Sequence, residues 1–398
     1  MNCTELDDDE DFFRFQHMDF DHDVFLSHFQ LRNLMACASR DHLYYASRSK
    51  VLHWNPCKTK ELSEPSVAMD LTEPDVQPLH SFPGFGIQIS TLTAAHDILV
   101  AGGFCGEYSL MNLKSPRNTK HTEGVITDHN NAITNHVEVY LARRSGLPLA
   151  AFASNDNGMR ILDIGTNKFI AEHAYKHAIN CTAVSPDLRL RVLVGDTTDV
   201  LICNAETGET LQSLEGHRDY GFACDWADDG WTVATGNQDK MVKIWDARKW
   251  TNSSGVAQPV TTIAAEVAGV RKLKFSPLGS GKRVLLAAEP ADIISVIDAQ
   301  TFTSKQTLSF FGEIGGVDFT NDGQNVFVAI CDNMRGGIME FERCDSASGD
   351  AYDLEGLRES HKSQMGSDEE AYSYRKVRGT IEQRNRKQAA LGISMGYF

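Results

Sequence analysis

A histidine, a threonine and an aspartate lie close together within residues 216–248, which read "GHRDYGFACDWADDGWTVATGNQDKMVKIWDAR". A hydroxyl, an imidazole and a carboxylate are the groups that hydrolases combine as nucleophile, general base and orienting group. Thr235, His217 and Asp239 have the side chains for these roles. However, nothing nearby in the sequence supplies an oxyanion hole or an elbow that presents the hydroxyl. We therefore favour a structural role for them, which depends on the elements that position them.

Other chemistry has less support. Glu172, His173 and His177 have a metal-like spacing for a helix, but their segment precedes the strand-like "INCTAVSP" and is expected to be an outer strand or connection, where that spacing does not converge. No phosphate-binding glycine motif occurs, and the nine cysteines include no CxxC pair. The sequence therefore predicts no catalytic residue, no metal ion and no cofactor.

The charge balance points to the kind of partner. Acidic residues number 54 against 38 basic ones, for a formal net charge of -16. This argues against direct binding of nucleic acid or of an anionic membrane, and it favours protein or peptide partners. The N-terminus "MNCTELDDDEDFFRF" is acidic where a secretory signal needs a basic start, and no stretch approaches the roughly 18 apolar residues of a membrane span. We expect a soluble protein of the cytoplasm, the nucleus or both.

A diverged repeat runs through most of the chain. The endings "VLHWNP", "SLMNL", "RILDI", "LICNA", "VKIWDA", "SVIDA" and "IMEFER" each place an Asp, Asn or Glu after an apolar residue, at intervals of 41 to 57 residues. The shorter intervals match the roughly 40 to 45 residues of a four-stranded propeller blade, and turn-rich inserts account for the longer ones. Apolar runs of small residues between tight turns predict strands buried on both faces.

These repeats predict an all-β fold, a single seven-bladed β-propeller over residues 23–343. A closed ring needs a strand from one terminus to complete the last blade, because an unpaired edge invites aggregation. The segment "DVFLSHFQ", residues 23–30, is our candidate for it. Residues 1–22 are expected to be a flexible, acidic, disordered tail, and residues 344–398 a polar tail that is partly helical or disordered.

The unit with "GH" at 216–217 and "WD" at 245–246 resembles a WD repeat. More widely, "HFQLRNL", "ISTLTAAHDILVAGGFCGE", "NNAITN", "AEPAD" and "FGEIGGVDF" resemble a fungal and plant family of WD-repeat proteins, over roughly residues 28–343. The resemblance implies a structural tetrad of hydrogen-bonded side chains, which here are His217, Thr235, Asp239 and Trp245. Buried indole and hydroxyl groups rarely stay unpaired, so such a chain of bonds would fasten the fold.

The turns between the middle strands are expected to gather at one rim of the central channel, where loops on a rigid scaffold concentrate binding. Their acidic residues would form an acidic rim that favours a basic partner; the alternative is that some of them are buried supports. The candidate interaction residues on these turns and their neighbours are Phe104, Asp156, Tyr220, Glu289, Pro290, Asp292 and Asp332.

The sequence thus predicts a non-enzymatic scaffold for protein–protein interactions. "WDAR", residues 245–248, also resembles the WDxR box by which some WD-repeat proteins dock as substrate receptors on cullin-type ubiquitin ligases, which would give Arg248 a binding role. A substrate receptor or a regulatory subunit of another enzyme therefore remains the alternative.

Overall fold

A computed structural model describes residues 3–58, 64–81, 84, 86–116, 119–332 and 335–344. All regular secondary structure in these ranges is β-strand, and none of it is a helix long and apolar enough to cross a membrane. The expected polar tail at 344–398 lies outside the described residues except for Cys344.

Five antiparallel sheets of four strands each follow one another along the chain, and in each the strands pair in sequence order. Their strands are β2 (Met35–Ser39), β3 (His42–Ser47), β4 (Lys50–Trp54) and β5 (Ser66–Asp70); β6 (Ile89–Ala95), β7 (Ile98–Gly103), β8 (Glu107–Asn112) and β9 (Thr122–Val125); β10 (Thr134–Leu141), β11 (Pro148–Ser154), β12 (Gly158–Asp163) and β13 (Lys168–Ala174); β14 (Ile179–Val184), β15 (Leu190–Gly195), β16 (Val200–Asn204) and β17 (Thr210–Leu214); β18 (Gly221–Trp226), β19 (Thr232–Asn237), β20 (Met241–Asp246) and β21 (Thr261–Ala264).

A sixth sheet of seven strands holds the remaining elements. They are β22 (Lys272–Phe275), β23 (Val284–Ala288), β24 (Ala291–Asp298), β25 (Lys305–Phe319), β26 (Asn325–Ile330), β27 (Gly337–Arg343) and β1 (Phe13–Asp19). The long strand β25 pairs with β24 up to Glu313 and with β26 from Ile314 onward. It therefore joins two four-stranded units, and the pairings are consistent with the seven blades that the sequence predicts.

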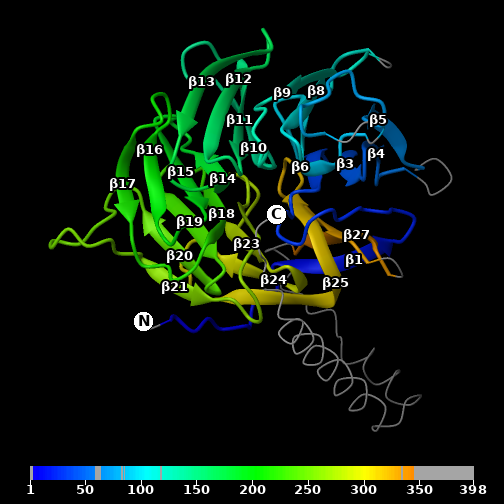
Figure 1. Cartoon of the computed structure of the whole chain (residues 1–398). Coiled ribbons are helices and arrows are strands. Elements are labelled where there is room, and N and C mark those ends of the chain that lie inside the picture. The colour runs from blue at the N-terminus through cyan, green and yellow to red at the C-terminus, as the bar shows by residue number, and fades with distance from the viewer. Residues whose placement is uncertain are drawn as a thin grey trace, which may run out of the picture. The chain divides into compact units, whose positions relative to one another are not determined.

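The sheets follow one another around a ring (Figure 1), and the first strands of successive blades pack against each other. Hydrophobic clusters lie between neighbouring blades: one of them joins Cys181 and Val192 of the fourth blade to Trp226 and Trp245 of the fifth. A side chain at Gly102 in β7 would meet the Thr134 side chain of the next blade at 2.5 Å. The small residues of the sequence pattern are thus required where two sheets approach closely.

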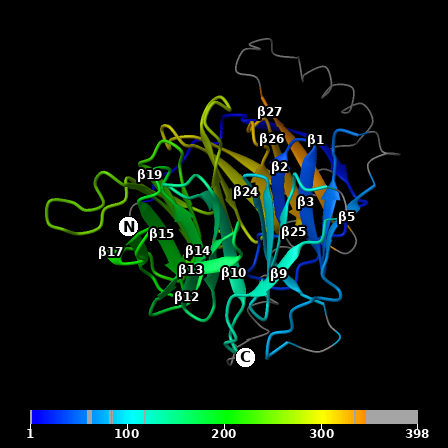
Figure 2. The ribbon, with the colours of Figure 1, turned by 90° about the horizontal axis from the view of Figure 1, so that it is seen from above.

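The strand that closes the ring is not the one expected from the sequence. β1 pairs antiparallel with β27, from Phe13 opposite Arg343 to Asp19 opposite Ile338 (Figures 1 and 2). Residues 23–30 form no strand and instead connect β1 to the first blade. The reason is that Phe13, which is 1% exposed, packs into the core of the last blade, whereas the 23–30 segment follows the closing strand along the chain.

The acidic N-terminal segment is also more ordered than its composition suggests. The amide of Thr4 donates to the carbonyl of Thr262 at 2.9 Å, and Asp7 exchanges two backbone hydrogen bonds with residues 303 and 305. Glu10 lies 2.5 Å from Lys282, and the ring of Phe12 is buried. The prediction of a disordered tail over 1–22 is therefore wrong for residues 4–19, because backbone pairing and two buried phenylalanines outweigh charge repulsion.

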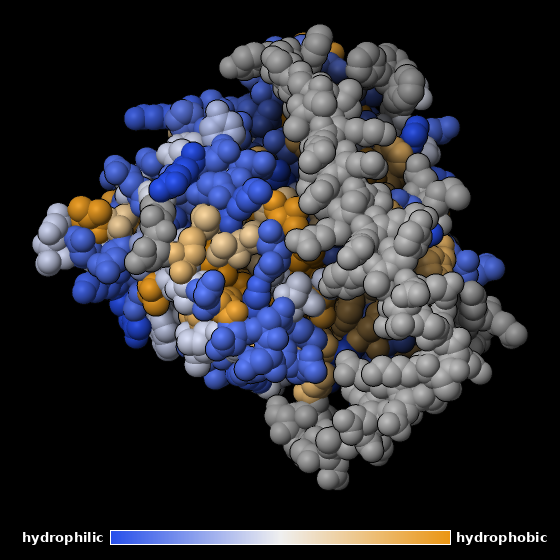
Figure 3. Space-filling model, turned by 90° about the horizontal axis from the view of Figure 1, so that it is seen from below, coloured by the Kyte–Doolittle hydropathy of each residue, from blue (hydrophilic) through white to orange (hydrophobic). Residues whose placement is uncertain are grey.

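Figure 3 shows the molecule in space-filling form, seen from below relative to Figure 1. Where the surface is not grey, hydrophobic residues form an interrupted band between hydrophilic areas. Within the N-terminal segment, Leu6 packs against the core of the fifth and sixth blades. The segment thus fastens the outer edges of three successive blades.

Candidate functional site

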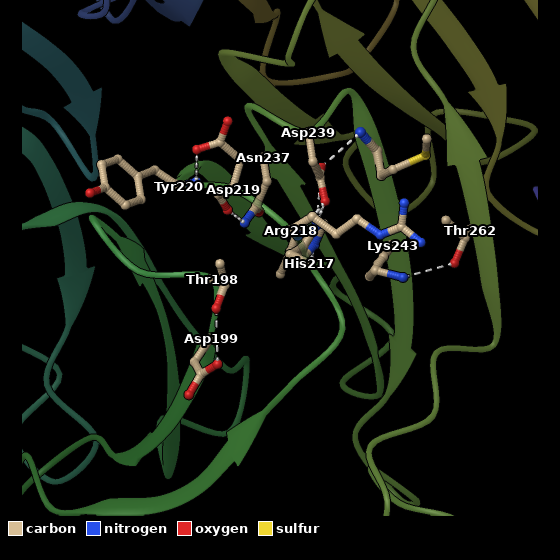
Figure 4. A network of polar contacts seen from close by, with 12 residues as sticks. Thr198, Asp199, His217, Arg218, Asp219, Tyr220, Asn237, Asp239, Lys243 and Thr262 are labelled. Carbon is tan, nitrogen blue, oxygen red and sulfur yellow. Dashed lines mark hydrogen bonds and ion pairs between the residues drawn. The ribbon is translucent and has the colours of Figure 1, made fainter. Parts of the chain in front are cut away.

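The four residues of the implied tetrad lie together in the fifth blade. His217 Nδ1 is 3.1 Å from Asp239 Oδ2, and its Nε2 is 2.9 Å from the hydroxyl of Thr235. The indole N–H of Trp245 donates to the same hydroxyl at 2.9 Å. Figure 4 shows His217 and Asp239 pointing toward one another, with Arg218 beside them; the amide of Arg218 also donates to Asp239.

Burial fits this chain of bonds to a structural role. Thr235 is fully buried, and its hydroxyl already serves two partners. Burial lowers the pKa of His217 despite the hydrogen bond and the charge of Asp239. The imidazole is therefore neutral, with Nδ1 donating to Asp239 and Nε2 accepting from Thr235. No substrate can approach this hydroxyl without displacing the core around it.

The turns between second and third strands lie at the same end of the blades as the connections that lead into each first strand. We call this surface the turn face. Backbone bonds tie the two sets of loops together, as between Gln238 and Tyr220 at 2.8 Å and between Asp196 and Ala178 at 3.0 Å. Arg248 follows β20 at its other end and therefore lies on the opposite face.

Two of the expected acidic side chains, those of Glu289 and Asp156, are buried, and Asp292 is half-buried. Glu289 is 2% exposed and accepts backbone N–H bonds from residues 266, 267 and 268 at 2.6–3.2 Å. Asp156 pairs with Arg160 at 2.8 Å, and its side chain is 3% exposed. Asp292 accepts the amide of Gly312 at 2.8 Å. All three carboxylates hold loops in place, and the buried Glu289 and Asp156 do not contribute to the expected acidic rim.

The other candidates are at least partly accessible. Tyr220 is 48% exposed, and Phe104 and Pro290 are half-buried on the turn face. Asp332 accepts the amide of Arg335 at 2.9 Å and is partly exposed. On the opposite face the Arg248 side chain is 65% exposed; it pairs with Asp246 at 2.7 Å and lies over the ring of Trp231, 4.9 Å from its centre.

Carboxylates on the first strands, which the sequence analysis missed, link successive blades. Each accepts a backbone N–H of the next blade's first strand: Glu138 from Val184 at 2.8 Å, Asp225 from Phe275 at 2.6 Å, and Asp318 from Cys37 at 3.0 Å. Burial raises the pKa of Asp225 to about 6, although Lys274 opposes this. Their signal was an acidic residue within an otherwise apolar strand, as in "HVEV", "ACDW" and "GVDF".

Two adjoining shallow pockets flank residues 19–24, where the last blade meets the first. One of about 310 Å³ is lined by Asp19, Trp54 and Lys58 among others, and one of about 380 Å³ by Asp23 and Asp332 among others. Phe20 and Asp21 line both pockets, and Phe20 is 64% exposed. We call Asp19, Phe20, Asp21, Asp23 and Asp332 the seam site.

A buried histidine fixes the segment that carries this site. His22 is 3% exposed; its Nδ1 lies 3.0 Å from the hydroxyl of Tyr45, and its ring lies 4.3 Å from that of Trp54. Burial lowers the pKa of His22 against the opposing charges of Asp19 and Asp21. The neutral ring thus anchors the backbone between the two pockets, so that Phe20 is presented on an ordered segment.

No group of three or more His, Cys, Asp or Glu within the described ranges has a geometry that could hold a metal ion. Glu172 and His173 are neighbours on β13, where successive side chains point to opposite faces. Glu172 pairs with Arg160 at 2.8 Å. His177 lies beyond the end of that strand.

Among the comparisons with known proteins, a family match falls on the region of the fifth blade. A family model described as "WD domain, G-beta repeat" matches residues 208–246. A chain from the crystal structure of the mitotic checkpoint complex superposes with a TM-score of 0.63 at 16% identity, covering 83% of this chain and 93% of that chain. This agreement concerns the fold.

Curated relatives match shorter stretches. Protein HIR1 of Cryptococcus neoformans is 30% identical over 131 residues, 33% of this chain and 14% of that protein. The human intraflagellar transport protein 122 homolog is 31% identical over 86 residues, 20% of this chain and 7% of that protein. The periodic tryptophan protein 2 homolog of Schizosaccharomyces pombe is 30% identical over 111 residues, 27% of this chain and 12% of that protein. The aligned stretches thus span only a small part of these relatives.

Proposed function

The chain is a WD-repeat β-propeller, and from this premise we propose that it is a non-catalytic scaffold that binds a basic segment of a partner protein at the seam site. The observation that carries the proposal is the pair of adjoining pockets that share Phe20 and Asp21. An exposed aromatic side chain among carboxylates suits lysine or arginine, whose alkyl stem packs on the ring while the charged end meets the acids.

Charge supports the same partner. Asp21 and Asp23 are exposed beside Phe20, and Asp19 and Asp332 are partly exposed. Lys58 lines only the first pocket, and Asp23 and Asp332 line only the second, so the second pocket is the more acidic one. The net charge of -16 would further favour encounter with a basic partner.

The test measures binding of a fluorescent lysine- and arginine-rich peptide to the full chain. Asp23→Lys should weaken binding by about tenfold or more, as expected for reversing a charge at a contact. Glu206→Lys makes the same charge change at a side chain that is 76% exposed after β16, away from the turn face, and should leave affinity within about twofold. Equal losses in both variants would mean that net charge alone attracts the peptide, which would refute the seam site.

A second candidate function is that of a substrate receptor on a cullin-type ubiquitin ligase. Arg248 and Trp231, which is 42% exposed, form an accessible basic and aromatic pair on the face opposite the turn face. Purification of the tagged protein from cells should then recover a cullin adaptor, and Arg248→Ala should abolish that recovery while Asp23→Lys leaves it unchanged. We propose the cytoplasm or the nucleus as the location, which imaging of the same tagged protein tests.

A further inference from the structure

A second binding position lies on the turn face, at Arg271. This residue directly precedes β22, and its amide donates to the carbonyl of Ala288 at 2.9 Å. The side chain is 7% exposed, and its guanidinium lies over the ring of Phe222, 4.0 Å from the ring centre. The guanidinium is thus held between the fifth and sixth blades.

Arg271 lacks the acceptors that a buried cation normally has. Its Nη2 donates to the side-chain oxygen of Gln238, but Nε and Nη1 have no hydrogen-bond partner among the described residues. Asp219 is near enough to act on the charge, yet its Oδ1 accepts the amide of Tyr220 at 2.8 Å and no ion pair with Arg271 forms. A buried charge that is neither paired nor fully hydrogen-bonded is costly, so this arrangement is unusual for a purely structural arginine.

The neighbouring cations already have partners. Arg32 donates to the carbonyls of Phe29 and Ile314 and pairs with Glu313. Lys272 donates to the side-chain oxygen of Asn33 at 2.6 Å. Burial and the charge of Arg32 lower the pKa of Arg271 to about 10, which still leaves it charged at neutral pH. Arg271 is therefore a charged group that no carboxylate of the described residues pairs with, and one negative charge would balance it.

Gln238 is the exposed residue that accepts the hydrogen bond from Nη2 of Arg271. It lies in the turn after β19. Its backbone N–H donates to the carbonyl of Tyr220 at 2.8 Å. An exposed neutral amide can move away at little cost, and a carboxylate in its place would accept charge-assisted bonds that are about twice as strong. Tyr220, 48% exposed beside it, offers an aromatic surface to the same ligand.

We propose that Arg271 binds the carboxylate of an acidic side chain from a partner protein, which displaces the side-chain amide of Gln238. The position is separate from the seam site, and its existence does not depend on the basic partner proposed above. Together the two positions would let the protein recognise partner segments of both charges.

The test uses a short peptide of glutamate and glycine as the probe and records the thermal unfolding midpoint of the full chain with and without it. A ligand that binds only the folded state raises the midpoint. The wild type should shift, and Arg271→Gln should lose the shift. Gln238→Glu supplies the carboxylate within the chain, so this variant should unfold at a higher temperature without peptide and should no longer respond to it.

Gln258→Glu is the matched control. It adds the same charge at an exposed position in the connection after β20, away from the turn face, and should keep the wild-type response. The absence of a shift in the wild type, or an undiminished shift in Gln238→Glu, would overturn the proposal even if Arg271→Gln fails to fold. If a phosphoserine peptide raises the unfolding midpoint and the glutamate peptide does not, the ligand of Arg271 is a phosphate, and the proposal of a carboxylate is wrong.

Discussion

Asp239, in the turn after β19, lies 3.1 Å from the imidazole of His217, which belongs to the connection before β18. The two residues are 22 positions apart, and their bond joins the two loops that frame the fifth blade on the turn face. Through Thr235 the same chain of bonds reaches Trp245 on β20. It therefore links two of the blade's strands, β19 and β20, to the loop that enters the blade.

Thr235→Val should lower the free energy of unfolding by about 2 to 4 kcal/mol, because it leaves Nε2 of His217 and the indole N–H of Trp245 buried without partners. Chemical denaturation measures the change. Thr207→Val, at an exposed turn, is the control and should stay within about 0.5 kcal/mol of the wild type. A loss no larger than the control's would show that the tetrad contributes little to stability.

The neutral state of His217 predicts a pH dependence. Burial lowers its folded-state pKa below the ordinary value of 6.5, so near that pH the unfolded chain binds a proton that the folded protein excludes. The contribution of the neutral His217 to the free energy of unfolding is therefore fully present above about pH 6.5. It falls at lower pH, by up to about 1.4 kcal/mol per pH unit, until the pKa of His217 in the folded protein is reached.

His217→Asn should reduce that slope relative to the wild type in denaturation curves taken from pH 7.5 down to about 5, the window set by the ordinary histidine pKa. Asp239 titrates in a different pH range. Burial raises its pKa, but hydrogen bonds led by that of His217 lower it below the ordinary value of 3.8. The contribution of Asp239 to stability is therefore lost only below about pH 3.8. Identical slopes in both proteins would contradict a neutral, buried His217.

The closing strand offers a comparison of two residues on one element. Phe13→Ala should cost about 3 to 5 kcal/mol, since it empties a buried position. Phe15→Ala, at a residue that is 56% exposed on the same strand, should cost less than about 1 kcal/mol. Thermal and chemical unfolding of both variants checks this, and equal losses would mean that β1 does not close the ring as described.

The carboxylate that links the third and fourth blades gives a further prediction. Glu138 pairs with Arg191, whose side chain is fully buried, and Glu138→Ala should cost about 3 to 5 kcal/mol by leaving that charge unpaired. Glu342→Ala breaks the exposed pair with Arg14 and should cost at most about 1 kcal/mol. If the two losses measured in urea are alike, Glu138 does not hold these blades together.

Much of the architecture could be predicted because it is written in local patterns. Apolar runs such as "ILVAGG" and tight turns such as "GNQDK" specify strands and hairpins over a few residues, and their recurrence specifies blades. The residues of the tetrad could be named because all four lie within the one unit that resembles a WD repeat, and the resemblance implies their roles.

The roles of single charged residues could not be predicted in this way. Glu289 was expected at an acidic rim, but it points inward, because its neighbours in the folded chain include three backbone N–H groups that lack other acceptors. Apart from Asp332, the seam site was missed because residues 1–22 have the composition of a disordered tail, although Phe12 and Phe13 pack into the core of the last blade.

The sequence by itself determined that this protein is built from β-hairpin units with one intact WD repeat, because the period of side-chain burial along a strand is a local property. Only the tertiary structure decided which segment closes the ring, which carboxylates face solvent, and that the buried Arg271 donates to an amide oxygen where Arg191 pairs with a carboxylate. These depend on pairs such as Phe13 with Arg343 and Arg271 with Gln238, which folding alone brings together.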